Sequence, residues 1–367
     1  MVHIILLSAL VLSIPFKKNL RLYKFSFVIL FLFCALRYGF GNDYFSYYEG
    51  FEAIHNGEDA FGGQYLYILL NKIFPNFYLL IAAISLVYVA AIYFLMISNV
   101  PKQIIWLSMF ILLINPYVFL INLSAIRQCI AMILFIRAIK YAIEKKFIVY
   151  TCFIIAAMLF HASAIILLPV YLIINEKKVS VKTAVMITAG VIFLLVVSGI
   201  LLRVLTWIVK LFNNPNYEHY LNQGSTNSLQ ATLLSAIFFI YIIINLPSLS
   251  GKTLIYAKLY LFATILNVLA YRLSMLTRIT MYFDVFSIVA IPLLIYENQN
   301  KFKNTMKNAM EKRAGSNSIS VVYRVVNLYV LPCLIILIYL LRYYSFFTNP
   351  LWESFWEYHT IFDAWNY

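Results

Sequence analysis

Long apolar runs, separated by short polar breaks, are the feature that most restricts how this chain of 367 residues can fold. Apolar residues make up 63% of the sequence and charged residues only 11%, whereas a soluble domain carries about a quarter charged residues. There is too little polar surface to cover a water-soluble globule of this size. The composition therefore excludes a soluble enzyme, a nucleic-acid module and a disordered chain. The runs are continuous and do not alternate with a period of two, which predicts an all-α, polytopic membrane protein.

The apolar runs predict about twelve transmembrane helices in a single transmembrane domain over residues 1–367. The expected spans are 2–16, 25–40, 76–98, 104–121, 125–143, 147–160, 162–175, 183–205, 230–247, 254–271, 279–296 and 322–341. The two segments beside His161 have only about 14 residues each, fewer than the roughly 20 that a full crossing needs. Both flanks of this pair are basic, which favours a hairpin that returns to the side where it began.

The segments between the spans have distinct compositions. Outer loops are expected at about 41–75 and 206–229, a cytoplasmic loop at about 297–321 and an aromatic periplasmic tail at 342–367. Residues 65–75 are apolar but too short to cross, which suggests a helix that lies in the outer interface or dips back.

The net charge of +14 is explained by membrane topology. The loops placed inside, with the adjacent helix ends, hold 20 of the 28 Lys and Arg residues but only 4 of the 14 acidic residues. Basic residues concentrate on the cytoplasmic side of membrane proteins. The charge therefore indicates orientation, and no nucleic-acid partner is expected.

Arginine is distributed differently from lysine. Of the 20 basic residues placed inside, 16 are Lys, whereas six of the eight placed outside are Arg. The six are Arg37, Arg127, Arg203, Arg272, Arg278 and Arg342. The guanidinium group matches the geometry of phosphates and carboxylates. The set therefore predicts an outer-leaflet pocket for an anionic headgroup, most simply a diphosphate. The alternative is that these arginines pair with acidic side chains or lipid phosphates and anchor the helix ends.

Two motifs precede the middle of the chain. Arg37 and Asp43 are separated by two glycines that allow a tight exit from the membrane. In one interpretation, the Arg binds phosphate and the neighbouring Asp acts as a base or binds sugar. In the other, the two residues form a local ion pair within an interfacial tyrosine belt. Arg127 opens a predicted span, where a positive charge opposes the helix dipole, and this favours a ligand role.

Two further motifs follow. His161 lies at a predicted outer turn and is either a proton acceptor or hydroxyl binder, or a helix-packing residue. Arg278 and Tyr282 are four residues apart and share a helix face, whereas Asp284 does not share it. Arg278 is therefore a candidate ligand-binding residue.

Together these motifs resemble a family of polysaccharide polymerases, the EpsG-like relatives of the Wzy O-antigen polymerases. The similar segments are Arg37 with Gly41-Asn42-Asp43-Tyr44 and Tyr47, Gly63-Gln64-Tyr65-Leu66, Ile126-Arg127-Gln128 with Ala131, Phe160-His161-Ala162-Ser163-Ala164 with Leu167-Leu168-Pro169, and Arg278 with Tyr282-Phe283 and Pro292. Their order and spacing match over residues 30–300. The family pattern often has a Glu where this chain has Gln64, so either the base lies elsewhere in this chain or Gln64 only binds.

The resemblance implies a glycosyltransferase of the bacterial inner membrane with its active site facing the periplasm. The donor would be a growing glycan on undecaprenyl diphosphate, and the acceptor one lipid-linked repeat unit. A hydroxyl of the acceptor would attack the anomeric carbon of the donor, and undecaprenyl diphosphate would leave. The product would be O-antigen or a related surface polysaccharide. Membrane lipid and a chain-length-regulating co-polymerase are further expected partners, and no metal or other cofactor is expected.

Specific roles follow for the residues of these motifs. Fixed arginine donors would stabilise the charge of the leaving diphosphate, and a base would take the proton of the attacking hydroxyl. Asp43, His161 and Glu218 are the candidate bases, in that order. The expected catalytic residues are Asp43, His161, Arg127 and Arg278, and the expected substrate- or diphosphate-binding residues are Arg37, Arg203, Arg272, Tyr44, Tyr47, Gln64 and Tyr282.

Three other functions use similar residues. A flippase for lipid-linked oligosaccharides would bind the same ligand, but it predicts charges near mid-span and pseudo-symmetric halves. A ligase that moves glycan onto lipid A shares the diphosphate chemistry. A membrane O-acyltransferase could use His161 but needs a path to a cytosolic acyl donor, for which the sequence gives no sign.

Overall fold

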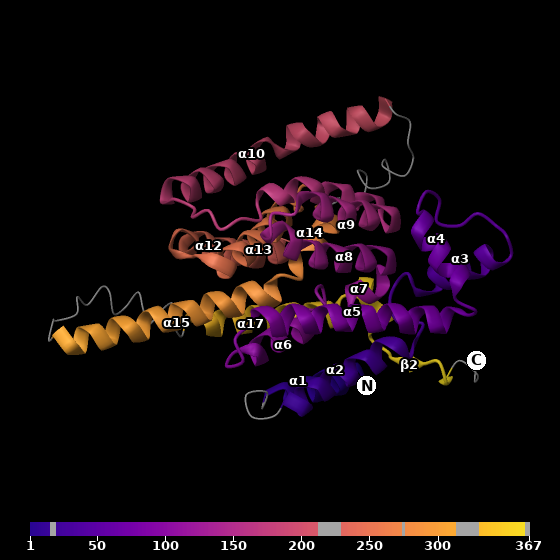
Figure 1. The fold of residues 1–367 in the computed structure, drawn as a ribbon. Coiled ribbons are helices and arrows are strands. Elements are labelled where there is room, and N and C mark those ends of the chain that lie inside the picture. The colour runs from indigo at the N-terminus through magenta and orange to yellow at the C-terminus, as the bar shows by residue number, and fades with distance from the viewer. Residues whose placement is uncertain (15–19, 212–228, 274–275, 313–329, 364–367) are drawn as a thin grey trace. The chain divides into compact units, whose positions relative to one another are not determined.

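The computed structural model describes residues 1–14, 20–211, 229–273, 276–312 and 330–363. Most of this part of the chain is helical, as the sequence predicts (Figure 1). The chain divides into two compact units, one formed by Met1–Tyr171 with Ile291–Tyr367 and the other by Leu172–Ala290. Each unit is described by itself.

The first unit holds the N-terminal helices and the C-terminal elements. These are α1 (Val2–Ser13), α2 (Leu20–Ala35), β1 (Arg37–Tyr38), α3 (Tyr44–His55), α4 (Tyr65–Ile73), α5 (Phe77–Asn99), α6 (Ile105–Ile114), α7 (Ile121–Ser124), α8 (Ile126–Ile143), α9 (Phe147–Phe160), η2 (Ala162–Leu172), α17 (Leu331–Thr348), η5 (Pro350–Phe355) and β2 (His359–Thr360). Helix α2 packs on α1 and α5, α5 packs on α8, and α8 packs on α9. The short helix α4 contacts α3, α5 and α9.

Helix α5 is the longest apolar helix of the first unit. The side chain of Asn76 accepts a hydrogen bond from the backbone N–H of Leu79 at 2.9 Å and caps the helix start. The 23 residues of α5 extend about 35 Å at 1.5 Å per residue, which exceeds the roughly 30 Å of a bilayer core. A single α-helix can therefore satisfy all of its internal backbone hydrogen bonds across the membrane.

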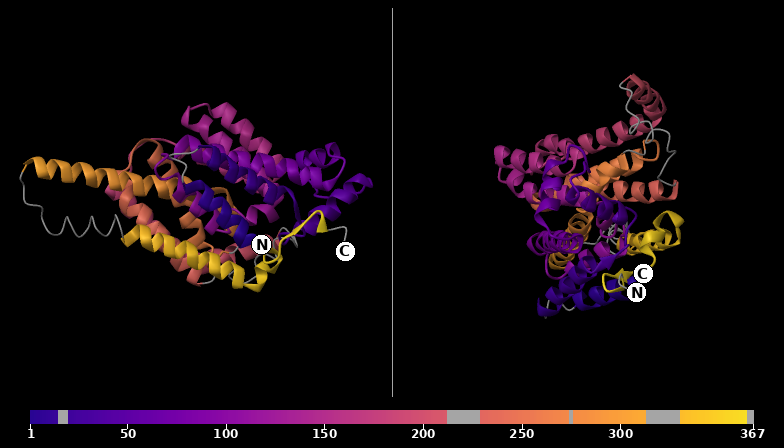
Figure 2. Two further views of the ribbon diagram at one scale, coloured as in Figure 1. Left: turned by 90° about the horizontal axis from the view of Figure 1, so that it is seen from below. Right: turned by 90° about the vertical axis from the view of Figure 1, so that its right-hand side faces the viewer.

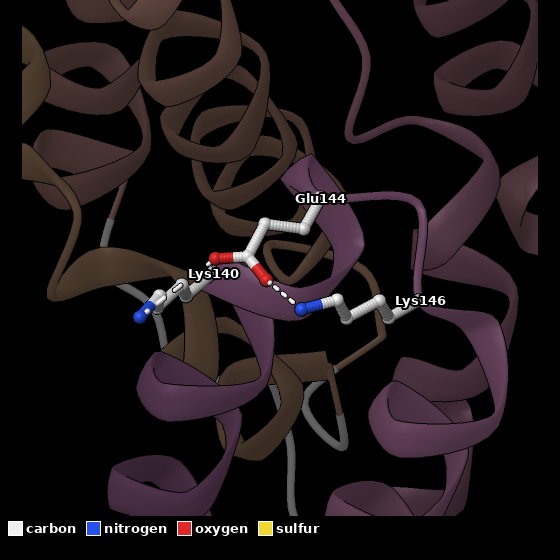
Figure 3. A network of polar contacts seen from close by, with 3 residues as sticks. All are labelled: Lys140, Glu144 and Lys146. Carbon is white, nitrogen blue, oxygen red and sulfur yellow. Dashed lines mark ion pairs between the residues drawn. The ribbon is translucent and has the colours of Figure 1, made fainter.

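A tight basic turn connects α8 to α9 (Figure 3). Glu144 follows the last residue of α8, and its carboxylate lies 2.7 Å from Nζ of Lys146 and 3.7 Å from Nζ of Lys140. Lys145 adopts a left-handed backbone conformation with φ of 59°. The ion pairs are exposed, so solvent screening leaves each of them only a small contribution to stability. The turn contains paired charges, and it is rich in Lys, which is the composition that the sequence analysis expects of cytoplasmic loops.

Helix α9 and the 3₁₀-helix η2 form the hairpin that the sequence predicts around His161. Near the start of α9, the hydroxyl of Tyr150 donates to the carbonyl of Leu167, and the ring of Phe147 packs edge-to-face on Tyr171 at 5.0 Å. At about 1.5 Å per residue for α9 and 2.0 Å for η2, the two arms have similar lengths of roughly 21 and 22 Å. Both arms are shorter than a bilayer core.

The second unit contains α10 (Val181–Leu211), α12 (Leu229–Asn245), η3 (Leu246–Ser248), α13 (Gly251–Leu269) and α14 (Leu276–Asp284). Helix α13 packs on α10, α12 and α14. The Nζ of Lys258 in α13 donates to the backbone carbonyls of Asn175 and Lys177 at 2.9 and 3.0 Å. This lysine therefore fixes the segment ahead of α10 to α13.

The predicted span 279–296 is a bent pair of helices. Helix α14 ends at Asp284, and α15 (Ser287–Lys312) begins after a break of two residues with a bend of 54°. Helix α15 is the long orange helix of Figure 2. The hydroxyl of Ser287 donates to the carbonyl of Asp284 at 2.6 Å and satisfies an acceptor at the break. Helix α15 also extends into the stretch expected to be a cytoplasmic loop, of which residues 313–321 lie outside the described part.

The structure does not confirm the count of twelve spans. By length and composition, the described helices include four that can cross a membrane, or five if the bent pair counts as one. The four are Phe77–Asn99, Val181–Ile200, Ala231–Ser248 and Gly251–Leu269. Other predicted spans are shorter apolar helices, such as α6, which ends at Ile114 because Pro116 disfavours helical backbone at Asn115. The predicted span 162–175 is the 3₁₀-helix η2.

The two predicted outer loops differ in how much of them is described. Residues 41–75 contain α3 and α4, and α4 has nine residues, in agreement with a predicted helix too short to cross. Of the second loop, residues 212–228 lie outside the described part, and so does the candidate base Glu218.

The C-terminal tail, residues 349–363, packs on the segment that follows α2. Strand β2 pairs antiparallel with β1, so that Arg37 faces Thr360. The backbone N–H of Gly41 donates to the carbonyl of Ser354 at 3.2 Å. The hydroxyl of Tyr358 donates to the carbonyl of Phe33 at 2.7 Å, and the two rings stack at 4.7 Å. The tail therefore holds residues 33–41 in place.

Asp363 gives the tail a testable pH dependence. The backbone N–H and hydroxyl of Thr360 donate to its carboxylate at 2.6 and 2.8 Å, and these bonds hold the pKa of Asp363 below its usual range. Because the folded pKa is depressed, the stabilisation is complete above the unfolded pKa of about 3.9 and is lost as the pH falls through the folded pKa. We expect Asp363→Asn to speed hydrogen exchange of residues 359–361 at pH 7, and the difference from wild type to shrink at pH 2, because the carboxylate becomes protonated as the pH falls.

The control for this experiment is Glu353→Gln, because Glu353 is an exposed acid of the same tail. This control should exchange like wild type at both pH values. Equal exchange in wild type and Asp363→Asn at pH 7 would show that the carboxylate does not hold the tail.

Candidate active site

Asp43 lies at the start of α3, on the segment that the C-terminal tail covers. It occupies the N-cap position, its side chain is exposed, and its backbone N–H donates to the hydroxyl of Ser124 at 3.0 Å. The next residue, Tyr44, is buried, and its hydroxyl donates to the backbone carbonyl of Arg37 at 3.3 Å. Burial raises the pKa of Tyr44, so the hydroxyl remains a donor. The carboxylate of Asp43 is thus presented to solvent from a fixed backbone.

Arg37 is buried behind this segment. Its guanidinium donates to the carbonyl of Cys34, to the hydroxyl of Ser85 at 3.1 Å and to the carbonyl of Leu123 at 3.2 Å. Its side chain is 2% exposed, and no ion pair to Asp43 occurs among the described residues. Arg37 therefore joins the end of α2 to α5 and α7 in this structure. Its predicted role in binding substrate stays a prediction.

Arg127 is held differently, in the first turn of α8. Its Nε donates to the hydroxyl of Tyr47 at 3.3 Å, and its guanidinium lies over the rings of Tyr47 and Phe61 at 5.5 and 4.9 Å. The side chain is half-buried. Its two terminal nitrogens form no hydrogen bond within the part of the chain that the structure describes. The aromatic rings therefore orient the guanidinium while its terminal donors stay available to an anion.

The other predicted residues of the first unit surround one hydrophobic cluster. The cluster joins the starts of α3, α4, α5 and α8 and includes Tyr44, Tyr47 and Ile126. Phe160, at the end of α9, packs against it. His161 follows Phe160 as a half-buried residue at the end of α9, and Gln64 precedes the first residue of α4. The first unit thus brings Asp43, Gln64, Arg127 and His161 to segments that share a core.

The remaining predicted residues lie in the second unit. Arg203 on α10 is exposed, and so is Arg272, whose guanidinium lies 5.5 Å from the ring of Tyr271. On α14, Arg278 is exposed and Tyr282 is fully buried. The roles of these residues and the predicted convergence of the six arginines stay predictions. The sixth arginine, Arg342, lies in the first unit, 6.0 Å from the ring of Tyr117.

Asp284 is a buried acid that the sequence did not assign to the site. It accepts hydrogen bonds from Nδ2 of Asn267 at 3.1 and 3.4 Å, next to the break between α14 and α15. This contact joins α13 to α14. No group of three or more His, Cys, Asp or Glu side chains able to hold a metal occurs among the described residues.

Two further residues of the site have only weak sequence signals. Phe61 forms part of the aromatic surface under Arg127, and the Gly62-Gly63 pair that follows it indicates an irregular backbone there. Ser124 fixes the backbone of Asp43, and its position three residues before Arg127 could have suggested that the two motifs meet. Neither residue is conspicuous without the fold.

A sequence model described as the EpsG family matches residues 20–310 of the chain. The match runs from the start of α2 into α15 and includes the predicted site residues of both units, whereas the C-terminal tail lies beyond it. It confirms the resemblance shown by the sequence motifs. Neither the comparison with curated proteins nor the comparison with solved structures gave a match.

The two arginines of the first unit should respond differently to substitution. Arg37→Leu leaves two carbonyls and a hydroxyl without their donor in a buried place, at about 1–3 kcal/mol for each group. Arg127→Leu removes only the Nε donor of the Tyr47 hydroxyl, which the backbone N–H of the substituted residue still reaches at 3.5 Å. We expect Arg37→Leu to lower the melting temperature in detergent and the yield of monodisperse protein strongly, and Arg127→Leu to change both little. Comparable losses in the two variants would contradict this assignment.

Proposed function

Since the chain belongs to the EpsG family, we propose that it is a membrane glycosyltransferase that polymerises undecaprenyl-diphosphate-linked oligosaccharide repeat units. The product is O-antigen or a related surface polysaccharide, and the reaction takes place at the periplasmic face of the bacterial inner membrane. The observation that carries the proposal is the family match over 20–310. The position of Arg127 supports it, because this residue offers oriented, unoccupied donors to a phosphate.

The proposed reaction exchanges one bond for another at the anomeric carbon of the donor glycan. A hydroxyl oxygen of the acceptor repeat unit forms the new bond to this carbon, and the bond from the carbon to the diphosphate oxygen breaks. The electron pair of that bond leaves with undecaprenyl diphosphate, and the proton of the hydroxyl goes to a base. Negative charge therefore grows on the leaving diphosphate, where fixed donors stabilise the transition state most.

Arg127 is the residue best placed to stabilise this charge in the first unit. The Tyr47 hydroxyl binds Nε of Arg127, so the side chain needs little reorganisation when the diphosphate charge develops. Within the second unit, Arg278 is the proposed catalytic arginine, and Arg272 and Arg203 are proposed diphosphate-binding residues. Tyr282 is proposed to contribute to binding from the buried side of α14.

Asp43 and His161 are the two proposed bases within the described residues. Asp43 is exposed at the start of α3, and its backbone is fixed by Ser124 and the C-terminal tail. His161 is half-buried at the end of α9, beside the cluster that contains Tyr47. Tyr44, Tyr47 and Gln64 shape the sugar-binding side of this region in the proposal. A co-polymerase that regulates chain length is a proposed partner.

Deletion of the gene tests the proposed function. We expect single-repeat glycan to persist while long polysaccharide ladders vanish from a gel of surface glycan, because the repeat units are still made and exported but not joined. Ladders that persist unchanged would exclude a polymerase. Complete absence of surface glycan would indicate a flippase, and failure to transfer glycan to lipid A would indicate a ligase.

A charge-conserving substitution tests the role of Arg127. Lysine keeps the positive charge of Arg127 but loses the planar fork and the Nε donor that Tyr47 binds. We expect Arg127→Lys to reduce the polymerisation rate about a hundredfold, as for the loss of one transition-state donor, and Arg278→Lys to reduce it similarly. The measurement is the rate at which ladders appear after induction, at matched protein levels.

Arg137→Lys is the matched control, because Arg137 is an exposed arginine near the other end of α8 and its guanidinium lies over the ring of Tyr141. This variant should polymerise like wild type. Normal ladders from Arg127→Lys would show that the residue only anchors the helix.

A further inference from the structure

Helix α4 carries a row of polar side chains on its buried face. Gln64, Tyr67 and Asn71 are spaced at i, i+3 and i+7 and therefore lie along one side of the helix. Tyr67 and Asn71 are completely buried. The Oε1 of Gln64, the hydroxyl of Tyr67 and the Oδ1 of Asn71 lack a hydrogen bond of good geometry within the part of the chain that the structure describes, although the Asn71 amide lies beside the Tyr67 hydroxyl and its Nδ2 donates to the Tyr67 carbonyl at 2.7 Å. Three such atoms in one row are unusual, because buried polar groups are nearly always paired.

The ring of Phe61 packs beside this row. It meets the ring of Tyr67 edge-to-face at 5.1 Å and stacks on Tyr47 at 5.6 Å. The guanidinium of Arg127 lies 4.9 Å from its centre. The unpaired row on α4 and the oriented guanidinium of Arg127 are therefore joined by one aromatic side chain.

The backbone of Phe61 is in a conformation that a bulky residue rarely adopts. Its φ is 60°, and Gly63 follows with φ of 79°. Its ring fits against Gly50 in α3, where an added Cβ would lie 2.2 Å from the ring. Disfavoured backbone conformations persist where packing holds them, and they concentrate at ligand-binding segments. Phe61 is therefore held in place by its ring contacts and not by its local backbone preference.

We propose that the row formed by Gln64, Tyr67 and Asn71 is the hydroxyl-binding wall of a sugar subsite beside Arg127, and that the ring of Phe61 occupies the place of the sugar ring until substrate binds. The proposal deepens the proposed function and rests on it. Amide and phenol groups bind the hydroxyls of a sugar, and an aromatic face such as that of Tyr47 covers its apolar side. Burial raises the pKa of Tyr67, so its hydroxyl stays protonated and can donate as well as accept.

The placement of the wall fits the chemistry of the repeat unit. A six-membered sugar ring has nearly the size of the phenyl ring that it would displace. The wall lies next to the guanidinium proposed to bind the diphosphate, so the bound sugar would be the one attached to that diphosphate. The three polar groups would then select sugars by the positions of their hydroxyls, because a mismatched sugar would leave them unpaired.

Substitutions that keep shape but remove polarity test the wall. Tyr67→Phe removes a hydroxyl without a well-formed hydrogen bond, and Asn71→Leu removes an unpaired Oδ1 together with the bond from Nδ2 to the Tyr67 carbonyl, so we expect the melting temperature to change little. Both should nevertheless lower the polymerisation rate about tenfold, as expected for one lost hydrogen bond to substrate. Tyr65→Phe is the matched control, because Tyr65 is an exposed tyrosine of the same helix.

The outcomes separate this proposal from the proposed function. If gene deletion removes the ladders while Tyr67→Phe and Asn71→Leu behave like the control, the chain is a polymerase and the wall binds only water. If gene deletion leaves the ladders intact, the proposed function itself fails. A fall in both melting temperature and rate would show that the polar atoms stabilise the fold, and this would also overturn the subsite.

Thiol labelling tests the covering role of Phe61 without any glycan. In protein whose exposed cysteines are replaced by Cys152→Ser and Cys333→Ser, Tyr67→Cys, at the wall position that the ring of Phe61 contacts, should react slowly with a water-soluble methanethiosulfonate. Adding Gly50→Ala should displace the ring of Phe61 and speed the reaction at least tenfold. Adding Gly62→Ala should not, because no atom lies within 4 Å of its added Cβ. Equal rates in all three backgrounds would show that Phe61 does not cover the wall.

Discussion

The buried guanidinium of Arg37 is the contact on which the arrangement of the first unit depends. It bonds to α2, α5 and α7 at once, through Cys34, Ser85 and Leu123. The backbone of the same residue pairs with β2, and its carbonyl accepts the hydroxyl of Tyr44. Both terminal nitrogens of Arg37 are bonded, whereas the buried Nε has no partner among the described residues. A buried charge is costly when its donors lose their bonds, so these segments have little freedom to separate. The hydrogen bonds of Arg37 therefore position the site residues that follow it in the sequence.

A series of contacts connects the hydrogen bonds of Arg37 to Arg127, the arginine proposed to bind the diphosphate. Tyr44 starts α3 against the Arg37 carbonyl, and one turn later Tyr47 binds Nε of Arg127. Ser124 fixes the backbone of Asp43 only three residues before Arg127. The acid and the arginine are therefore positioned by the same short stretch around α7. Because Tyr44 and Tyr47 also belong to one buried cluster, a substitution at either residue is expected to displace the side chain of Arg127.

The sequence predicted the parts of this structure that depend on composition and local pattern. The helical class, the ends of α9 and α5, the short helix in 65–75 and the hairpin around His161 follow from apolar runs and their breaks. The number of spans did not follow, because hydropathy does not reveal that Pro116 ends α6 or that residues 162–172 wind as a 3₁₀-helix. The pairing of β1 with β2 joins residues more than 300 positions apart, and no local signal specifies it.

The outer arginines illustrate the same limit at the level of function. In the sequence, Arg37 and Arg127 look equivalent, since each is a lone cation at the end of an apolar run. The structure separates them by the partners of their donors. Three protein acceptors bind the terminal nitrogens of Arg37, whereas the terminal nitrogens of Arg127 have no acceptor among the described residues and only its Nε is bonded, to Tyr47. A guanidinium whose donors are bonded to protein can bind a ligand only by breaking those bonds, so donor satisfaction distinguishes a structural arginine from one suited to bind phosphate.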